Sequence, residues 1–295
     1  MKKNTLLLSL IGLVTSAYAQ QNPTAMKYAQ IINADLAKKH LSIIASDAFE
    51  GRETGKPGAD KAAHYIADEF KSLGLQPIVN GAYFLDIPVV ESTFKVNLFT
   101  VNGTSFTSGK DFTATGGTDS KTINASDIVF IGYGIGADNY DDLKGIDITG
   151  KVVVYISNGE PMVNGKSKIT GTDQLSDWSA PRSNKRIQYI QSKKPALILA
   201  VNTAAGNRRG GGGGGRMSIK KDGTATANTQ AVVYTISPEI ADQLLKNSGK
   251  TFALVKGAID QAGMPQSQTV KADISTSYAT EETPVKAVDV LGFLP

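Results

Sequence analysis

Apolar residues recur at helical spacing through the first part of the chain. Between residues 60 and 74 they mark one face of a helix, with Asp60 placed to cap its start and Gly74 to end it. The same spacing predicts one or two further helices between residues 24 and 45. The segment 49–58 holds three glycines and a proline, so we expect a loop there.

The period changes after Pro77, where short β-branched and aromatic runs alternate with turn signals. A strand, a helix and a strand follow one another between residues 151 and 201, which predicts a crossover unit and an α/β fold class. We expect strands over residues 83–90, 94–101, 128–131, 151–156, 196–201, 231–236, 252–255, 270–274 and 285–294, and helices over residues 183–192 and 237–245.

The first residues have the order of a secretory signal peptide. Lys2 and Lys3 precede an apolar run over residues 6–14, and Ala17 and Ala19 have the spacing of a cleavage site. The apolar run is too short for a bilayer, and no later segment reaches the ~20 apolar residues of a membrane helix. We therefore expect cleavage after Ala19, a secreted or periplasmic protein, and no membrane partner.

Composition narrows the class of protein. The chain has 295 residues, two histidines and no cysteine, so disulfides and a cysteine-linked lipid anchor are excluded. The length leaves room for about two domains of ~100–150 residues each. The formal charge of +4 falls to +2 without Lys2 and Lys3, because 29 basic residues then face 27 acidic ones. Such a balance gives no reason to expect a nucleic-acid partner.

Three segments of the chain resemble one known family, and they follow one another in the family's order. They are residues 45–77, with the motif Glu50-Gly51-Arg52-Glu53-Thr54-Gly55; residues 127–135, followed by Tyr140-Asp141-Asp142 and residues 145–154; and residues 288–294. Together they are similar to the secreted zinc aminopeptidases of metallopeptidase family 28 that carry an inserted protease-associated domain.

The resemblance implies an α/β chain in which an incomplete zinc-exopeptidase domain, made of amino-terminal helices, receives a β-rich protease-associated domain. It divides the chain into the signal peptide (1–19), an amino-terminal peptidase segment (20–90), the protease-associated domain (91–270), and a linker with the first returning strand (271–295).

The family places its first zinc ligands, a histidine and an aspartate two residues later, one strand beyond the returning strand. We therefore expect this chain to be the amino-terminal fragment of a secreted hydrolase, a zinc-dependent metallopeptidase, and to be inactive alone. It should contain no catalytic, cofactor-binding or metal-binding residue and bind no zinc by itself. The alternative is a non-catalytic protease-associated module, so whether the chain is an enzyme stays open. Both hypotheses expect peptides or proteins as partners.

Few local signals suggest chemistry. His40 and His64 fall on separate helices without a second ligand at zinc spacing, so partly exposed helical histidines are the favoured interpretation. The pair Glu281-Glu282 precedes Thr283-Pro284, and we expect solvated charges in a linker.

Two acidic segments and one glycine tract leave alternatives open. Asp138, Asp141 and Asp142 offer ligands to calcium, but the EF-hand glycine and final glutamate are missing, which favours a turn with exposed acids. In the intact family the loop 50–55 would lie near the substrate cleft, and a structural ion pair is the alternative. Six glycines between Arg209 and Arg216 lack the ending of a phosphate-binding loop, so we expect a surface loop.

Overall fold

The computed structural model describes residues 22–117, 119–204, 215–220 and 230–295, so the expected signal peptide and most of the glycine tract lie outside the described residues. The described chain divides into two compact units. Unit 1 comprises the residues up to Pro88 together with Val285–Pro295, and unit 2 comprises Val89–Pro284. Among the described residues no helix is both long and apolar enough to cross a membrane.

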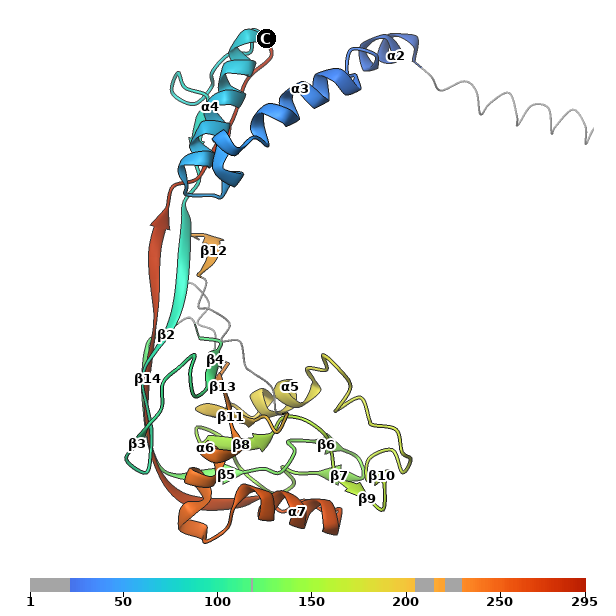
Figure 1. The fold of residues 1–295 in the computed structure, drawn as a ribbon, viewed down its shortest axis with the longest axis vertical. Helices are drawn as coiled ribbons and strands as arrows, with labels where there is room; N and C mark the ends of the chain where they lie inside the picture. Colours follow the sequence, from blue (N-terminus) through green and yellow to red (C-terminus); the bar gives the residue numbers. More distant parts are fainter. Residues whose placement is uncertain (1–21, 118, 205–214, 221–229) are drawn as a thin grey trace, which may run out of the picture. The chain divides into compact units, whose positions relative to one another are not determined.

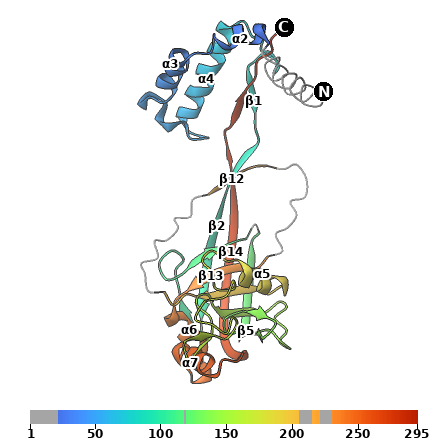
Figure 2. The same ribbon diagram turned by 90° about the vertical axis from the view of Figure 1, so that its right-hand side faces the viewer.

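In the described residues, unit 1 is built from three α-helices, one 3-10 helix and one pair of short strands. Its elements are α2 (Pro23–Ala29), α3 (Ala34–Ile44), the 3-10 helix η1 (Asp47–Arg52), α4 (Pro57–Ser72), β1 (Phe84–Asp86) and β15 (Val288–Val290). The side chains of Asn22 and Asn33 accept backbone hydrogen bonds at the starts of α2 and α3, so the two expected helices are confirmed. Strands β1 and β15 pair antiparallel; β1 is labelled in Figure 2, and β15 belongs to the red carboxyl-terminal segment.

The start of α4 corrects the sequence-based boundary. The helix begins at Pro57, not at Asp60, because proline is pre-organised for the first helical position and the loop before it turns tightly. Asp60 lies in the first turn and pairs with Lys286 Nζ at 2.9 Å. Gly74 follows the helix with a φ of +78°, which glycine adopts without strain, so the predicted end is confirmed.

The described part of unit 2 contains a nine-stranded mixed sheet and three short α-helices. In space the strands run β12-β2-β14-β5-β8-β11-β13-β4, and β3 pairs with β2. The strands are β2 (Val89–Val101), β3 (Thr104–Ser105), β4 (Thr113–Thr115), β5 (Lys121–Phe130), β8 (Val152–Ile156), β11 (Leu197–Val201), β12 (Arg216–Ile219), β13 (Val232–Ile236) and β14 (Gln268–Val285). Two further hairpins join β6 (Gly136–Ala137) to β7 (Tyr140–Asp141) and β9 (Met162–Val163) to β10 (Lys166–Ser167).

The centre of this sheet is parallel and buried on both faces. Strands β5, β8, β11 and β13 pair parallel, and every residue of β8 and β11 is buried. Helix α5 (Lys185–Ser192) covers one face, whereas α6 (Pro238–Leu245) and α7 (Phe252–Ala262) cover the other (Figure 1). The turn η2 (Lys246–Ser248) joins α6 to α7. The predicted crossover from β8 through α5 to β11 is confirmed.

Two other sequence-based assignments need correction. Residues 252–255 form the start of α7, not a strand, because Thr251 caps the helix and Phe252, Val255 and Ile259 are buried at helical spacing. Strand β14 continues through Val285, so Glu281-Glu282 lies in a strand and not in a linker, with both side chains exposed.

Candidate binding site

Unit 2 contains a pocket of about 340 Å³ between α5 and the edge of the sheet at β13 and β4. One wall is a single face of α5, formed by Ile187, Gln188 and Gln191 with Asn184 at the helix start. The four positions have the spacing i, i+3, i+4 and i+7 that brings side chains to one helical face. The opposite wall comes from the end of β4 and from residues 230, 231 and 233 at the start of β13.

The chemistry of the lining is polar but uncharged. Ile187, Ala231 and Val233 contribute apolar surface, and the remaining lining side chains carry amide or hydroxyl groups. Among the described residues, no aspartate, glutamate, lysine, arginine or aromatic residue lines the pocket. A charged ligand would therefore lose hydration without gaining an opposite charge, so the pocket suits a neutral ligand with hydrogen-bonding groups.

Gln191 joins the two walls of the pocket. Its Nε2 donates to the carbonyl oxygen of Ala231 at 2.7 Å, and its Oε1 accepts from the nitrogen of Ala231 at 2.8 Å. This amide therefore pairs with the backbone just ahead of β13 as a neighbouring strand would. In contrast, Asn184 and Gln188 are exposed on the same face of α5.

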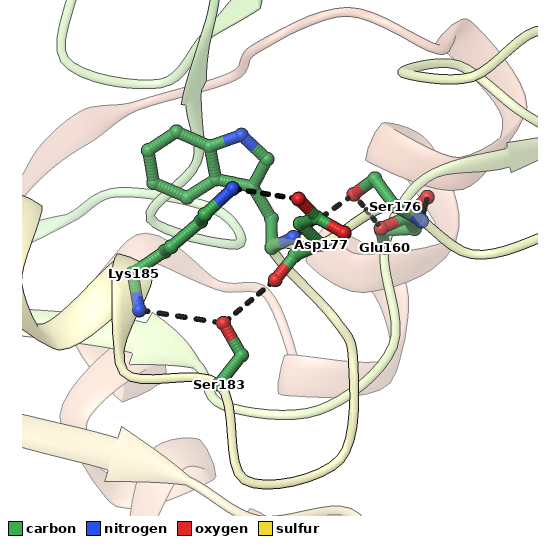
Figure 3. A network of polar contacts seen from close by, with 6 residues as sticks. Glu160, Ser176, Asp177, Ser183 and Lys185 are labelled. Carbon is green, nitrogen blue, oxygen red and sulfur yellow. Dashed lines mark hydrogen bonds and ion pairs between the residues drawn. The ribbon is translucent and has the colours of Figure 1, made fainter. Parts of the chain in front are cut away.

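A network of polar contacts holds the start of α5, as Figure 3 shows. Lys185 Nζ pairs with Asp177 Oδ2 at 2.8 Å, and Ser183 Oγ donates to the carbonyl oxygen of Asp177 at 2.6 Å. The ion pair is largely exposed and contributes little energy by itself. Its value is positional, because it ties the preceding loop to the first turn of the helix that forms the pocket wall.

The same loop is anchored deeper by the buried carboxylate of Glu160. This carboxylate accepts from Ser176 Oγ at 2.6 Å, from the Ser176 nitrogen at 3.0 Å, from Ser179 Oγ at 2.5 Å, and from Ser167 Oγ. Burial acts to raise the pKa of Glu160, but these hydrogen bonds outweigh it and leave the pKa below its ordinary value. Through these hydrogen bonds, the Glu160 carboxylate holds the loop in place.

Arg186 joins this loop to the sheet from the opposite face of α5. Its guanidinium donates to the carbonyl oxygen of Ile156 at 3.2 Å, and to the carbonyl oxygen of Gly159 and Ser179 Oγ. The side chain is buried, and its Nε has no hydrogen-bond partner among the described residues. Because its other nitrogens hold the loop in place, Arg186 positions α5 and does not face the pocket lining.

In the acidic segment that suggested a calcium site, two carboxylates accept hydrogen bonds from nearby groups of the protein. Asp142 is buried, which corrects the expectation that all three acids are exposed, and its Oδ2 accepts from the nitrogens of Tyr133 and Ile135 at 3.1 Å each. Tyr140 Oη donates to Oδ1 at 3.0 Å. Asp141 accepts from Tyr189 Oη at 2.7 Å, whereas Asp138 is exposed. The three acids are therefore not gathered into one ligand set.

The other candidate residues belong to unit 1, whereas the pocket belongs to unit 2. His40 on α3 contacts Tyr65 Oη through Nδ1 at 2.7 Å, and His64 on α4 contacts the carbonyl oxygen of Asp60 at 2.8 Å, as expected for helical histidines. Glu50 pairs with Lys61 at 2.6 Å, which favours the structural interpretation of the loop 50–55. Among the described residues no cluster of three or more histidines, aspartates or glutamates could hold a metal ion.

Sequence reasoning missed the pocket, although part of its signal was present. Asn184, Gln188 and Gln191 form a stripe of amide side chains along a helix whose opposite face is buried. Such a stripe is ordinarily a solvated surface, and only the packing of α5 against the sheet edge turns it into a wall.

Comparisons with known proteins identify no family for the chain. No family model matches it, and no curated protein matches it. Solved structures that are similar include an aminopeptidase from Aneurinibacillus sp. strain AM-1, at 15% identity and a TM-score of 0.41, with 86% of this chain and 47% of that chain covered. A zinc aminopeptidase from Bacillus subtilis has 14% identity and a TM-score of 0.30, with 87% and 46% covered.

A second structure of the Bacillus subtilis enzyme, at medium resolution, has 13% identity and a TM-score of 0.28, with 86% and 45% covered. The chain thus spans about half the length of these proteins. Identities and TM-scores this low carry no functional argument.

Proposed function

We propose that this chain is the amino-terminal portion of a secreted zinc-dependent aminopeptidase with an inserted protease-associated domain. The observation that carries the proposal is the insertion itself. Unit 1 is formed from both ends of the described chain, joined by the pairing of β1 with β15, and unit 2 is the continuous segment between them. Two of the three segments that resemble the family, residues 45–77 and 288–294, lie in unit 1 on either side of that insertion.

The apolar surface of unit 1 supports an incomplete domain. Helices α2 and α3 bury no residue, and α4 buries only Gly58, Ala63 and Ala67. Large apolar side chains are correspondingly exposed: Met26, Tyr28, Ile31, Ile32, Leu36, Leu41, Ile66 and Leu73. Amphipathic helices are stable when a sheet or other helices cover their apolar faces. A sheet contributed by the rest of a peptidase domain would provide that cover.

The chemistry of peptide hydrolysis would then reside outside this chain. A binuclear zinc site needs several imidazole and carboxylate ligands and a carboxylate base that deprotonates the attacking water. His40 and His64 are the only histidines of the chain, and they lie on different helices with different partners. Within this proposal the chain alone neither binds zinc tightly nor cleaves aminoacyl substrates.

The nucleotide sequence that follows the codon for Pro295 tests the proposal. We expect a frame that encodes a strand ending in a His-x-Asp motif, with a Glu-Glu pair and a further histidine later. A terminator with no such frame downstream would contradict it.

A second candidate function is non-catalytic binding of peptides or proteins by unit 2. The specific observation that favours it is the uncharged pocket beside α5. Purified chain that binds a peptide without hydrolysing it, in the absence of any downstream peptidase frame, would support this second function over the first.

A further inference from the structure

The pocket beside α5 adjoins a sheet edge that is open among the described residues. Strand β4 pairs with β13 on one side and ends the path of strands in the sheet. Thr115, its last residue, also lines the pocket. An edge strand presents backbone N–H and C=O groups that can pair with an added strand. The open edge and the pocket are therefore parts of one continuous surface.

We infer that this surface binds an extended peptide segment, which pairs with β4 and places an uncharged polar side chain, such as glutamine or asparagine, in the pocket. This inference deepens the second proposed function and is independent of zinc and of any downstream peptidase domain. The residues that would recognise the side chain are Asn184 and Gln188, whose amides can each donate and accept a hydrogen bond.

The size and lining of the pocket select this ligand class. Its volume of about 340 Å³ lies at the lower end of the range for small-ligand sites, which suits one or two residues of a peptide. The described lining residues include no cation, which disfavours phosphate groups. They include no aromatic ring either, which disfavours nucleobases, because nucleobases bind by stacking. Apolar contact with Ile187 and Val233 suits the methylene groups of a glutamine side chain.

Hydrogen bonds and one ion pair hold the pocket wall in place. The side chain of Gln191 makes two hydrogen bonds to the backbone of Ala231, and the ion pair between Lys185 and Asp177 holds the start of α5. A pre-organised wall loses little conformational entropy when a ligand binds, so hydrogen bonds to Asn184 and Gln188 would contribute to affinity.

The test uses the purified chain and four fluorescent probes. Three are blocked pentapeptides, acetyl-Thr-Val-Xaa-Val-Thr-amide, in which the central residue is glutamine, glutamate or lysine. The fourth is a neutral oligosaccharide, maltohexaose, because sugar hydroxyls also bind amide side chains. Anisotropy titrations give each Kd, and amide hydrogen exchange of residues 113–115 reports pairing with β4.

We expect the glutamine peptide to bind at least about tenfold more tightly than the charged peptides, because burying an unpaired charge costs more than ~1.4 kcal/mol. Exchange of at least one amide in β4 should slow. The variant Gln188→Ala should weaken binding about fivefold, the ratio that corresponds to one lost hydrogen bond. The control Gln261→Ala changes an exposed amide on α7 and should leave Kd unchanged.

Three results would overturn the inference, and each has a different consequence. Peptide binding that is unaffected by Gln188→Ala and by Asn184→Ala would refute this site and leave peptide binding by unit 2 intact. Binding of maltohexaose without peptide binding would replace the ligand class. No binding of any probe would remove both the site and the second proposed function, but would not affect the zinc-peptidase proposal.

Discussion

Asp142 offers the sharpest quantitative prediction, because two opposing effects on one buried carboxyl group can be separated. The residue is 1% exposed, which penalises its charged form. Its three hydrogen-bond donors, Tyr133 N, Ile135 N and Tyr140 Oη, favour the charged form. Burial outweighs the hydrogen bonds and raises the pKa of Asp142 from 3.8 to about 7.

The raised pKa of Asp142 determines how the free energy of unfolding changes with pH. The folded state binds the Asp142 proton more tightly than the unfolded state, so the stabilisation is present at low pH and is lost as pH rises through about 7. One pKa unit corresponds to ~1.4 kcal/mol, so a shift of about three units changes the free energy of unfolding by about 4 kcal/mol between about pH 4 and about pH 8.

The variant Asp142→Asn isolates this contribution. The amide does not titrate, yet its oxygen can still accept from the two backbone nitrogens that now bond Oδ2. Urea unfolding of both proteins can be followed by the fluorescence of Trp178, the single tryptophan of the chain, which lies in unit 2. The difference in unfolding free energy, native chain minus variant, should fall by about 4 kcal/mol between about pH 4 and about pH 8.

A difference that stays flat across this range would refute the reasoning. A difference that rises with pH would show that the three hydrogen bonds outweigh burial and that the pKa of Asp142 is lowered. Carboxyl groups distant from Asp142 titrate equally in both proteins, so their contributions cancel from the difference.

Three further predictions concern the stability of each unit. Glu160→Ala should lower the unfolding free energy by at least about 2 kcal/mol in urea titrations, because buried serine donors lose their acceptor. The exposed control Glu282→Ala should change the unfolding free energy by less than about 0.5 kcal/mol. Equal effects of the two variants would contradict this prediction. Gly58→Ala should destabilise unit 1 in thermal melts, because the added Cβ would lie 2.0 Å from a backbone oxygen. In the control Gly257→Ala, on α7, the added Cβ would meet no atom of another described segment within 4 Å, so this variant should be neutral or stabilising. A neutral effect of Gly58→Ala would refute the close contact. Limited proteolysis should cut unit 1 faster than it cuts residues 120–200, because the helices of unit 1 bury few residues. Faster cleavage within residues 120–200 would count against an incomplete domain.

The parallel centre of unit 2 was predictable from sequence because its residues satisfy one requirement. Strands β8 and β11 are continuous apolar runs, and burial on both faces of a sheet demands that pattern. Helix α6 was predictable for a local reason, since Ser237 caps it ahead of a proline in the first turn. The start of α7 was not, because four consecutive apolar residues fit a strand as well as a helix until the rest of the helix is considered.

The candidate site was harder to predict from the sequence, because it depends on contacts between segments that are distant in the chain. The burial of Asp142 requires the backbone nitrogens of Tyr133 and Ile135 to close around it, and composition alone indicates exposed acids. The pocket requires the amide stripe of α5 to face residues 115 and 231 across the sheet edge. Spacing identifies the stripe but does not identify what it faces.

Two forms of the protein, compared in parallel, would show whether this chain is the amino-terminal portion of a zinc aminopeptidase. One form ends at Pro295, and the other continues into the downstream reading frame. Bound zinc is measured by elemental analysis, and chelator-sensitive cleavage of leucine p-nitroanilide is measured on the same samples. We predict zinc binding and turnover in the longer form alone. Stoichiometric zinc and turnover in the shorter form, or neither property in the longer form, would contradict the account.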